Sequence, residues 1–158
     1  MHLAYSNCVP RTTFFNKLLP VLNRLDVTTL NRVKLNLQPR TEKIVKGLFH
    51  TDLGGDMDEE TMKTWTTSVY YINTNDGYTE FENGEKVKSA ENRIVKFQSN
   101  LKHRGTTCTD EQTRVVINFN YLPLHKRIWN TASRCWNSPT FWSCTMACLL
   151  MLLFLIDC

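Results

Sequence analysis

The stretch RVVINFNYL, residues 114–122, decides the predicted fold through its alternation of side-chain types. Successive side chains on a β-strand point to opposite faces, so this segment has two unlike faces. One face carries Arg114, Val116, Asn118 and Asn120, and the other carries Val115, Ile117, Phe119 and Tyr121. A strand with one apolar face and one face of arginine and asparagine is expected in the wall of a barrel that holds a ligand. The alternative is a sheet whose polar face meets solvent.

Similar strand signals precede this segment along most of the chain. They are separated by turn residues rather than by helices, which favours a sandwich or a barrel. The expected strands are residues 32–37, 48–52, 65–73, 78–81, 86–88, 93–98, 101–107 and 114–121. Between two of them, Asn83-Gly84 predicts a type I′ hairpin turn, in which both central residues take positive φ.

Length and composition indicate one folded unit. A chain of 158 residues with 42% hydrophobic and 22% charged residues can enclose a single core. Near-helical apolar spacing in residues 12–30 predicts one or two short helices, with a break or restart at Pro20. We expect residues 1–30 to form a helical N-terminal support, 31–122 a β-barrel domain and 123–158 an atypical tail rich in Cys, Trp and apolar residues.

The formal net charge of +4 is modest and does not predict nucleic acid as a partner. Basic residues do gather in one segment, where a single acidic residue, Glu42, interrupts them. The basic residues are Arg32, Lys34, Arg40, Lys43 and Lys46. We interpret this cluster as a solvated basic edge in preference to a phosphate-binding strip.

A candidate metal site arises from the triplet His50-Thr51-Asp52. On a strand, His50 and Asp52 point to the same face and could bind one ion together. His103 could add a second imidazole from a later β-rich stretch. Two histidines and one carboxylate form the facial triad of non-haem Fe(II) oxygenases, which leaves three adjacent coordination positions open. A single histidine in a strand is more often a packed or exposed residue, so the hypothesis depends on the combination.

The open positions suggest a co-substrate. A 2-oxo acid can chelate through two of them and O2 can take the third. The distal carboxylate of such an acid needs a cation deep in the pocket. Arg114 can pair with it in a two-pronged fork that lysine cannot match.

The order of FHTD, SVYYINTNDGYTEF, RIVKFQSNLKHRG and TRVVINFNY resembles the 2-oxoglutarate- and Fe(II)-dependent dioxygenases, particularly the small phage and bacterial members related to prolyl 4-hydroxylases. The resemblance spans roughly residues 31–122. It implies a double-stranded β-helix of the jelly-roll or cupin-like kind, iron ligands at His50, Asp52 and His103, and the 2-oxoglutarate carboxylate at Arg114. It also implies that residues 77–81 correspond to a structural hairpin of the family.

Two classes of function follow. The first is an enzyme that hydroxylates a C–H bond with Fe(II), 2-oxoglutarate and O2, releasing succinate and CO2. Its substrate could be a peptidyl proline, a free amino acid or an alkylated nucleobase, and fold analogy favours proline only weakly. The second is a non-catalytic cupin-like binding module that keeps the barrel without turnover.

The tail has no acidic residue between residue 123 and Asp157, and residues 146–156 are an unbroken apolar run. With the preceding residues from 141, this run is shorter than the roughly 20 residues of a membrane-spanning helix. It could be a marginal tail anchor, a helix packed on the barrel or on a partner, or a sequence that has drifted from its ancestral frame, and we favour the last.

The N-terminus does not look like a secretory signal, and the cysteines lack the spacing of a zinc site. We expect reduced thiols in the cytoplasm of a bacterium or phage-infected host, with tail-mediated membrane contact as a minor alternative.

Overall fold

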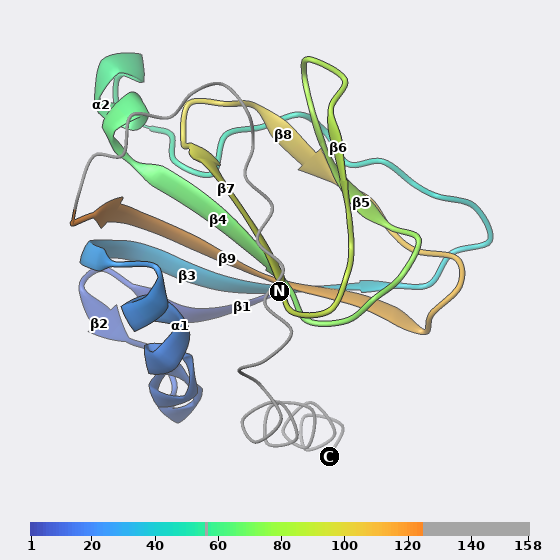
Figure 1. Cartoon of the computed structure of the whole chain (residues 1–158), viewed down its shortest axis with the longest axis horizontal. Helices are drawn as coiled ribbons and strands as arrows, with labels where there is room; N and C mark the ends of the chain where they lie inside the picture. Colours follow the sequence, from blue (N-terminus) through green and yellow to red (C-terminus); the bar gives the residue numbers. More distant parts are fainter. Residues whose placement is uncertain (56, 125–158) are drawn as a thin grey trace.

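The structure is a computed structural model that describes residues 1–55 and 57–124 (Figure 1). Strands are the main regular elements, and the helices are short. The elements are β1 (His2–Ser6), β2 (Val9–Pro10), the 3-10 helix η1 (Thr13–Leu18), α1 (Leu19–Arg24), β3 (Val27–Pro39), α2 (Glu59–Thr64), β4 (Thr66–Tyr71), β5 (Tyr78–Phe81), β6 (Lys86–Lys88), β7 (Arg93–Gln98), β8 (His103–Gly105) and β9 (Thr113–Pro123).

The strands form two antiparallel sheets. The large sheet has the order β2-β1-β3-β9-β4-β7 and the small sheet has the order β6-β5-β8. An extended segment at residues 46–50 borders β8 through two isolated bridges, Lys46 to Thr106 and His50 to His103. Figure 1 shows the small sheet beside the β4, β7 and β9 side of the large one, whereas the N-terminal helices lie by β1 and β3.

From β3 onward the chain repeatedly crosses between the two sheets. β3, β4, β7 and β9 belong to the large sheet, whereas the 46–50 segment, β5, β6 and β8 lie in or along the small one. This alternation of antiparallel strands between facing sheets is the jelly-roll, or double-stranded β-helix, arrangement. The predicted fold class, mainly β and cupin-like with short N-terminal helices, is therefore confirmed.

Two apolar clusters hold the layers together. The first packs η1 and α1 against the outer face of the large sheet, in a cluster that includes Leu18, Leu22, Ile117 and Phe119. The second lies between the sheets and joins Phe81 and Val87 of the small sheet to residues of the large one, including Val116. The two-faced pattern predicted for β9 is thus correct: its odd-numbered side chains face the helices and its even-numbered ones face the interior between the sheets.

Three expectations about the bounds and types of elements need correction. Residues 2–6 form β1, which pairs with β3, so the N-terminal support is not helical throughout. The break at Pro20 is present, because η1 ends and α1 begins beside it, but β3 already starts at Val27. Residues 48–52 form one bridge rather than a full strand.

The hairpin at Asn83-Gly84 is not a type I′ turn. Only Gly84 has positive φ, at 87°. Its N–H donates to the Phe81 carbonyl, and the Phe81 N–H donates to the Glu85 carbonyl. This pattern fits a three-residue loop with a glycine bulge, in which only the last loop residue needs the left-handed region.

The predicted apolar tail lies outside the described residues, beyond Leu124. Within the described part of the chain, no helix has the length and apolar character required to cross a membrane.

Candidate metal site

His50 and His103 face each other across an antiparallel bridge. Each backbone N–H donates to the other residue's carbonyl at 3.0 Å. Directly opposite residues of an antiparallel pair place their side chains on the same face, so the register itself brings the two imidazoles together. Their ring centroids lie 4.9 Å apart. Phe97 packs edge-on against the His103 ring at 4.8 Å and limits its rotation.

Each ring is oriented by an equivalent hydrogen bond to a backbone carbonyl. His50 Nδ1 lies 3.0 Å from the Leu48 carbonyl, and His103 Nδ1 lies 3.3 Å from the Leu101 carbonyl. A carbonyl oxygen only accepts, so each Nδ1 carries the proton and donates it. The Nε2 atom of each neutral ring then presents a lone pair, which is the arrangement that metal-bound histidines show.

The Asp52 carboxylate is the third potential ligand, and strands β3 and β9 hold it in place. Its Oδ1 lies 3.0 Å from Arg32 Nη2, and its Oδ2 accepts hydrogen bonds from Asn118 Nδ2 at 3.0 Å and Asn120 Nδ2 at 3.4 Å. The Arg32 Nη2 also donates to the backbone carbonyl of Asp52 at 2.8 Å. These contacts fix both the backbone and the side chain of Asp52.

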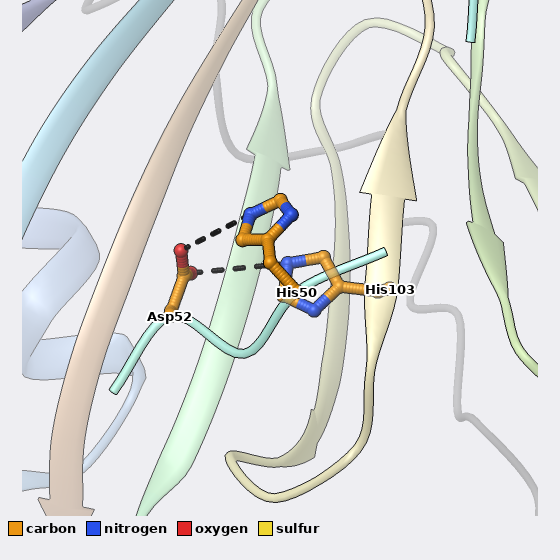
Figure 2. A group of neighbouring side chains, drawn as sticks. All are labelled: His50, Asp52 and His103. Carbon is orange, nitrogen blue, oxygen red and sulfur yellow. Dashed lines mark ion pairs between the residues drawn. The ribbon is translucent and has the colours of Figure 1, made fainter. Parts of the chain in front are cut away.

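Figure 2 shows the carboxylate facing the two rings. Asp52 Oδ1 lies 3.9 Å from His50 Nε2, and Asp52 Oδ2 lies 3.9 Å from His103 Nε2. Burial raises the pKa of Asp52, but the nearby His103 and Arg32 and the amide hydrogen bonds outweigh it, so the pKa is lowered overall. Asp52 is therefore an anion at neutral pH, as a metal ligand must be.

His103 is a buried base with an unsatisfied nitrogen. Its side chain is 4% exposed, whereas that of His50 is 49% exposed. Burial lowers the pKa of His103, and the attraction of Asp52 does not reverse this effect. Within the described residues, His103 Nε2 is a buried atom without a hydrogen-bond partner. Native proteins rarely leave such an atom unpaired, and a missing ion is one of the explanations.

These three residues fit a metal ion. One potential ligand atom from each lies within 4.8 Å of the others. Ligands that share an ion at about 2.1 Å lie roughly 3 to 4 Å apart, so small side-chain shifts would suffice. Two neutral imidazoles and one carboxylate suit a divalent transition metal and leave coordination positions open. The sequence prediction that His50, Asp52 and His103 form one group therefore agrees with their positions.

The histidines open into a cavity of about 130 Å³ between the sheets. Its walls carry positive and neutral polar groups but none of the described carboxylates. The lining residues are Lys34, Asn36, Gln38, His50, Val69, Thr79, His103, Gly105, Arg114, Val116 and Asn118.

Arg114, the predicted carboxylate anchor, lines this same cavity. It is 2% exposed, and burial lowers the pKa of its guanidinium. Its Nε donates to Ser89 Oγ at 2.8 Å, and its Nη2 donates to Thr79 Oγ1 at 3.3 Å. No carboxylate among the described residues pairs with it. Arginine stays charged in proteins, so Arg114 is a buried cation without a counter-charge in residues 1–55 and 57–124.

Two members of the basic cluster, Arg32 and Lys34 on β3, are not simply part of a solvated edge, whereas Arg40, Lys43 and Lys46 are exposed as expected. Arg32 pairs with Asp52, and Lys34 lines the cavity. In the register of β3 and β9, Arg32 lies opposite Asn120, Lys34 opposite Asn118 and Gln38 opposite Arg114. The signal was present in the sequence as a polar alternation along β3, equivalent to the one along β9.

Two solved structures resemble this chain at low sequence identity. No family model matches the chain, and neither does any curated protein. A cupin protein from Bacteroides fragilis is 14% identical over 70% of this chain and 80% of its own, with a TM-score of 0.43. A Pseudomonas putida prolyl-4-hydroxylase is 16% identical over 69% of this chain and 63% of its own, less than two thirds of its length, with a TM-score of 0.45. The strand order by itself establishes the fold, and the positions of His50, Asp52 and His103 by themselves define the candidate site.

Proposed function

We propose that this protein is an Fe(II)- and 2-oxoglutarate-dependent dioxygenase that hydroxylates a C–H bond. The observation that carries the proposal is the unpartnered Nε2 of buried His103, which lies close to His50 and Asp52. His103 and His50 line the same cavity as Arg114, a cation without a carboxylate partner among the described residues. A metal alone would explain the triad. The buried guanidinium of Arg114 on the same cavity wall indicates that an organic anion binds there as well.

The residues divide the work of binding. His50, Asp52 and His103 would hold Fe(II), and Arg114 would bind the distal carboxylate of 2-oxoglutarate, its guanidinium positioned by Ser89. When bound, iron and 2-oxoglutarate supply the activation of O2, with oxidative decarboxylation to succinate and CO2. Residues of both sheets line the cavity beside these groups.

Several features of the chain support a short dicarboxylate. Arg114 and Asn118, which contacts Asp52, are four residues apart on β9, or roughly 13 Å along the strand. Part of that distance is spanned by the arginine side chain. The cavity volume of about 130 Å³ is far larger than a single water molecule needs, so the cavity can hold part or all of a small metabolite. Thr79 adds a hydroxyl beside the guanidinium.

The decisive experiment is an anaerobic titration with Fe(II) and then 2-oxoglutarate. We expect a weak visible charge-transfer band that saturates at one equivalent of each. Admission of O2 should then release succinate in amounts that depend on iron. Absence of the band would contradict the proposed site. A band without iron-dependent succinate would instead indicate a binding module that lacks turnover.

The substrate follows from the same experiment. The classes to compare are peptidyl proline, free amino acids and alkylated nucleobases. Each carries its C–H bond on a group small enough to approach the cavity. We expect one class to increase succinate release over the uncoupled rate.

A further inference from the structure

Lys34 is a second cation on the cavity wall, and the proposed function does not use it. It lies on β3 directly opposite Asn118, the residue whose amide contacts Asp52. Its backbone is therefore level with the metal ligands, whereas Arg114 is opposite Gln38 further along the same two strands. The side chain of Lys34 is half-buried and lines the cavity together with His50 and His103.

Carboxylates in this part of the fold have other partners. Asp52 pairs with Arg32, and Glu80 pairs with Lys46, Lys86 and Arg104. Within residues 1–55 and 57–124, no ion pair involves Lys34.

The charge balance of the loaded site leaves Lys34 uncompensated. The doubly charged metal and the dianionic 2-oxoglutarate cancel each other, and Arg32 cancels Asp52. Arg114 and Lys34 remain as positive charges on a cavity wall without described carboxylates. The loaded site therefore keeps a net positive charge. Arg114 faces the distal carboxylate of the co-substrate, whereas Lys34, at the level of the metal, pairs with none of the described carboxylates.

We propose that Lys34 binds an anionic group, a carboxylate or a phosphate, on the molecule that is hydroxylated. The inference rests on the proposed function, because it assigns Arg114 to the co-substrate. The neighbouring Asn36 and Gln38 extend the polar wall along β3. An ammonium ion with three donors suits either kind of anion. An uncharged or cationic substrate would have to leave Lys34 unpaired or oppose it.

The test measures protection of Lys34 from acetylation by acetic anhydride, quantified by mass spectrometry on the full chain loaded anaerobically with Fe(II) and 2-oxoglutarate. The probes are acetate and methyl phosphate, with chloride at equal ionic strength as the reference. We expect one probe to slow modification of Lys34 saturably, and the more effective probe identifies the anionic group. Exposed Lys88 on β6 should react at the same rate in all three salts.

The variants Lys34→Met and Lys34→Arg complete the test. We expect Lys34→Met to bind the protecting anion about tenfold more weakly, the loss expected for a hydrogen bond to a charged group, and Lys34→Arg to retain most of the affinity. Anion affinity in these variants is read by calorimetry. Lys88→Met is the matched control, and the charge-transfer band should be unchanged in all three.

The two proposals fail separately. No charge-transfer band in the unaltered protein would remove the proposed function, and this inference with it. A normal band, with Lys34 modified equally fast in chloride, acetate and methyl phosphate, would remove this inference alone. Equal anion affinity in the unaltered protein and in Lys34→Met would likewise assign the anion to another residue.

Discussion

Arg32 holds Asp52 at two points with a single nitrogen atom. Arg32 Nη2 lies 2.8 Å from the backbone carbonyl of Asp52 and 3.0 Å from its carboxylate Oδ1. The Nε of the same guanidinium donates to Asn120 Oδ1 at 3.2 Å, and Asn120 contacts the other carboxylate oxygen. One arginine of β3 therefore ties the loop that carries the candidate metal ligand Asp52 to the large sheet.

Replacing Arg32 with Met should destabilise the protein before any metal is added. The change leaves the buried Asp52 carboxylate without its cation, and the expected loss is roughly 1 to 3 kcal/mol in the free energy of unfolding, since Arg32 is partly exposed. Urea denaturation in the presence of a chelator measures it. The control is Lys63→Met, which breaks an exposed pair with Glu60 and should change nothing measurable. Equal stability of the two variants would argue that Arg32 does not hold Asp52.

Loss of either histidine should abolish the charge-transfer band of the Fe(II) and 2-oxoglutarate complex. His50→Ala removes an exposed ring, so the protein should keep its stability while losing the band. His103→Ala also removes a buried ring that packs on Phe97, so its unfolding midpoint should fall as well. The exposed His2 on β1 provides the control, and His2→Ala should behave as the unaltered protein. A full-strength band in both His50→Ala and His103→Ala would rule out the triad.

Arg114→Ala should weaken 2-oxoglutarate binding without preventing iron binding. Removal of one partner of a buried charge pair typically costs a few kcal/mol, so the affinity should fall by about a hundredfold or more. Arg114→Lys restores the charge but not the fork, and should recover only part of the affinity. Separate titrations of iron and of 2-oxoglutarate distinguish the two steps. Unchanged 2-oxoglutarate affinity in Arg114→Ala would move the anchor to another residue.

Much of the site was predictable because the alternation of side chains on a strand is local. The faces of β9 follow from residues 114–122 alone, and the spacing of His50 and Asp52 needs no knowledge of the fold. The sequence could not show that His50 and His103 are directly paired, because this depends on the register between segments about fifty residues apart. Similarly, Arg32 and Lys34 resembled a solvated edge until the order β3-β9 placed them beside Asn120 and Asn118.

The short strands β1 and β2 were missed for a related reason. β1 is held by β3 in a register that a bulge interrupts between Leu3 and Tyr5, so its period-two pattern is broken. The hairpin at Asn83-Gly84 was located correctly but assigned the wrong turn. The sequence identified the glycine that takes positive φ, but the loop length that selects the turn type comes from the pairing of β5 with β6.

Stability should fall in alkaline solution through Tyr121. Burial raises the pKa of its hydroxyl to about 12, against an ordinary value of 10.0. Because the unfolded chain releases this proton first, the free energy of unfolding should decrease between pH 10 and about pH 12, by roughly 2 to 3 kcal/mol for this one group. Tyr121→Phe loses the hydroxyl that bonds Ser68 but should show a smaller decline over that pH range. Urea denaturation at pH 9 and pH 11.5 measures the difference, and parallel declines in both proteins would contradict the assignment.

Gly77 offers a test of the Arg114 pocket that leaves every proposed ligand in place. A Cβ atom at Gly77 would lie 2.6 Å from Arg114 Cδ and 2.7 Å from the backbone carbonyl oxygen of Thr107. The arginine side chain could shift, but the carbonyl belongs to the backbone, so Gly77→Ala must displace the guanidinium or the strand segment beside it. We expect weaker 2-oxoglutarate binding with iron binding retained, and a lower unfolding midpoint.

Gly54→Ala is the matched control, because a Cβ atom there meets nothing within 4 Å. It should leave iron binding, 2-oxoglutarate binding and the unfolding midpoint unchanged. Calorimetric titration of each ligand, with thermal unfolding of the same samples, separates a displaced Arg114 from a general loss of structure. If Gly77→Ala bound 2-oxoglutarate as tightly as Gly54→Ala while losing stability, then the position of the Arg114 guanidinium would not control co-substrate binding.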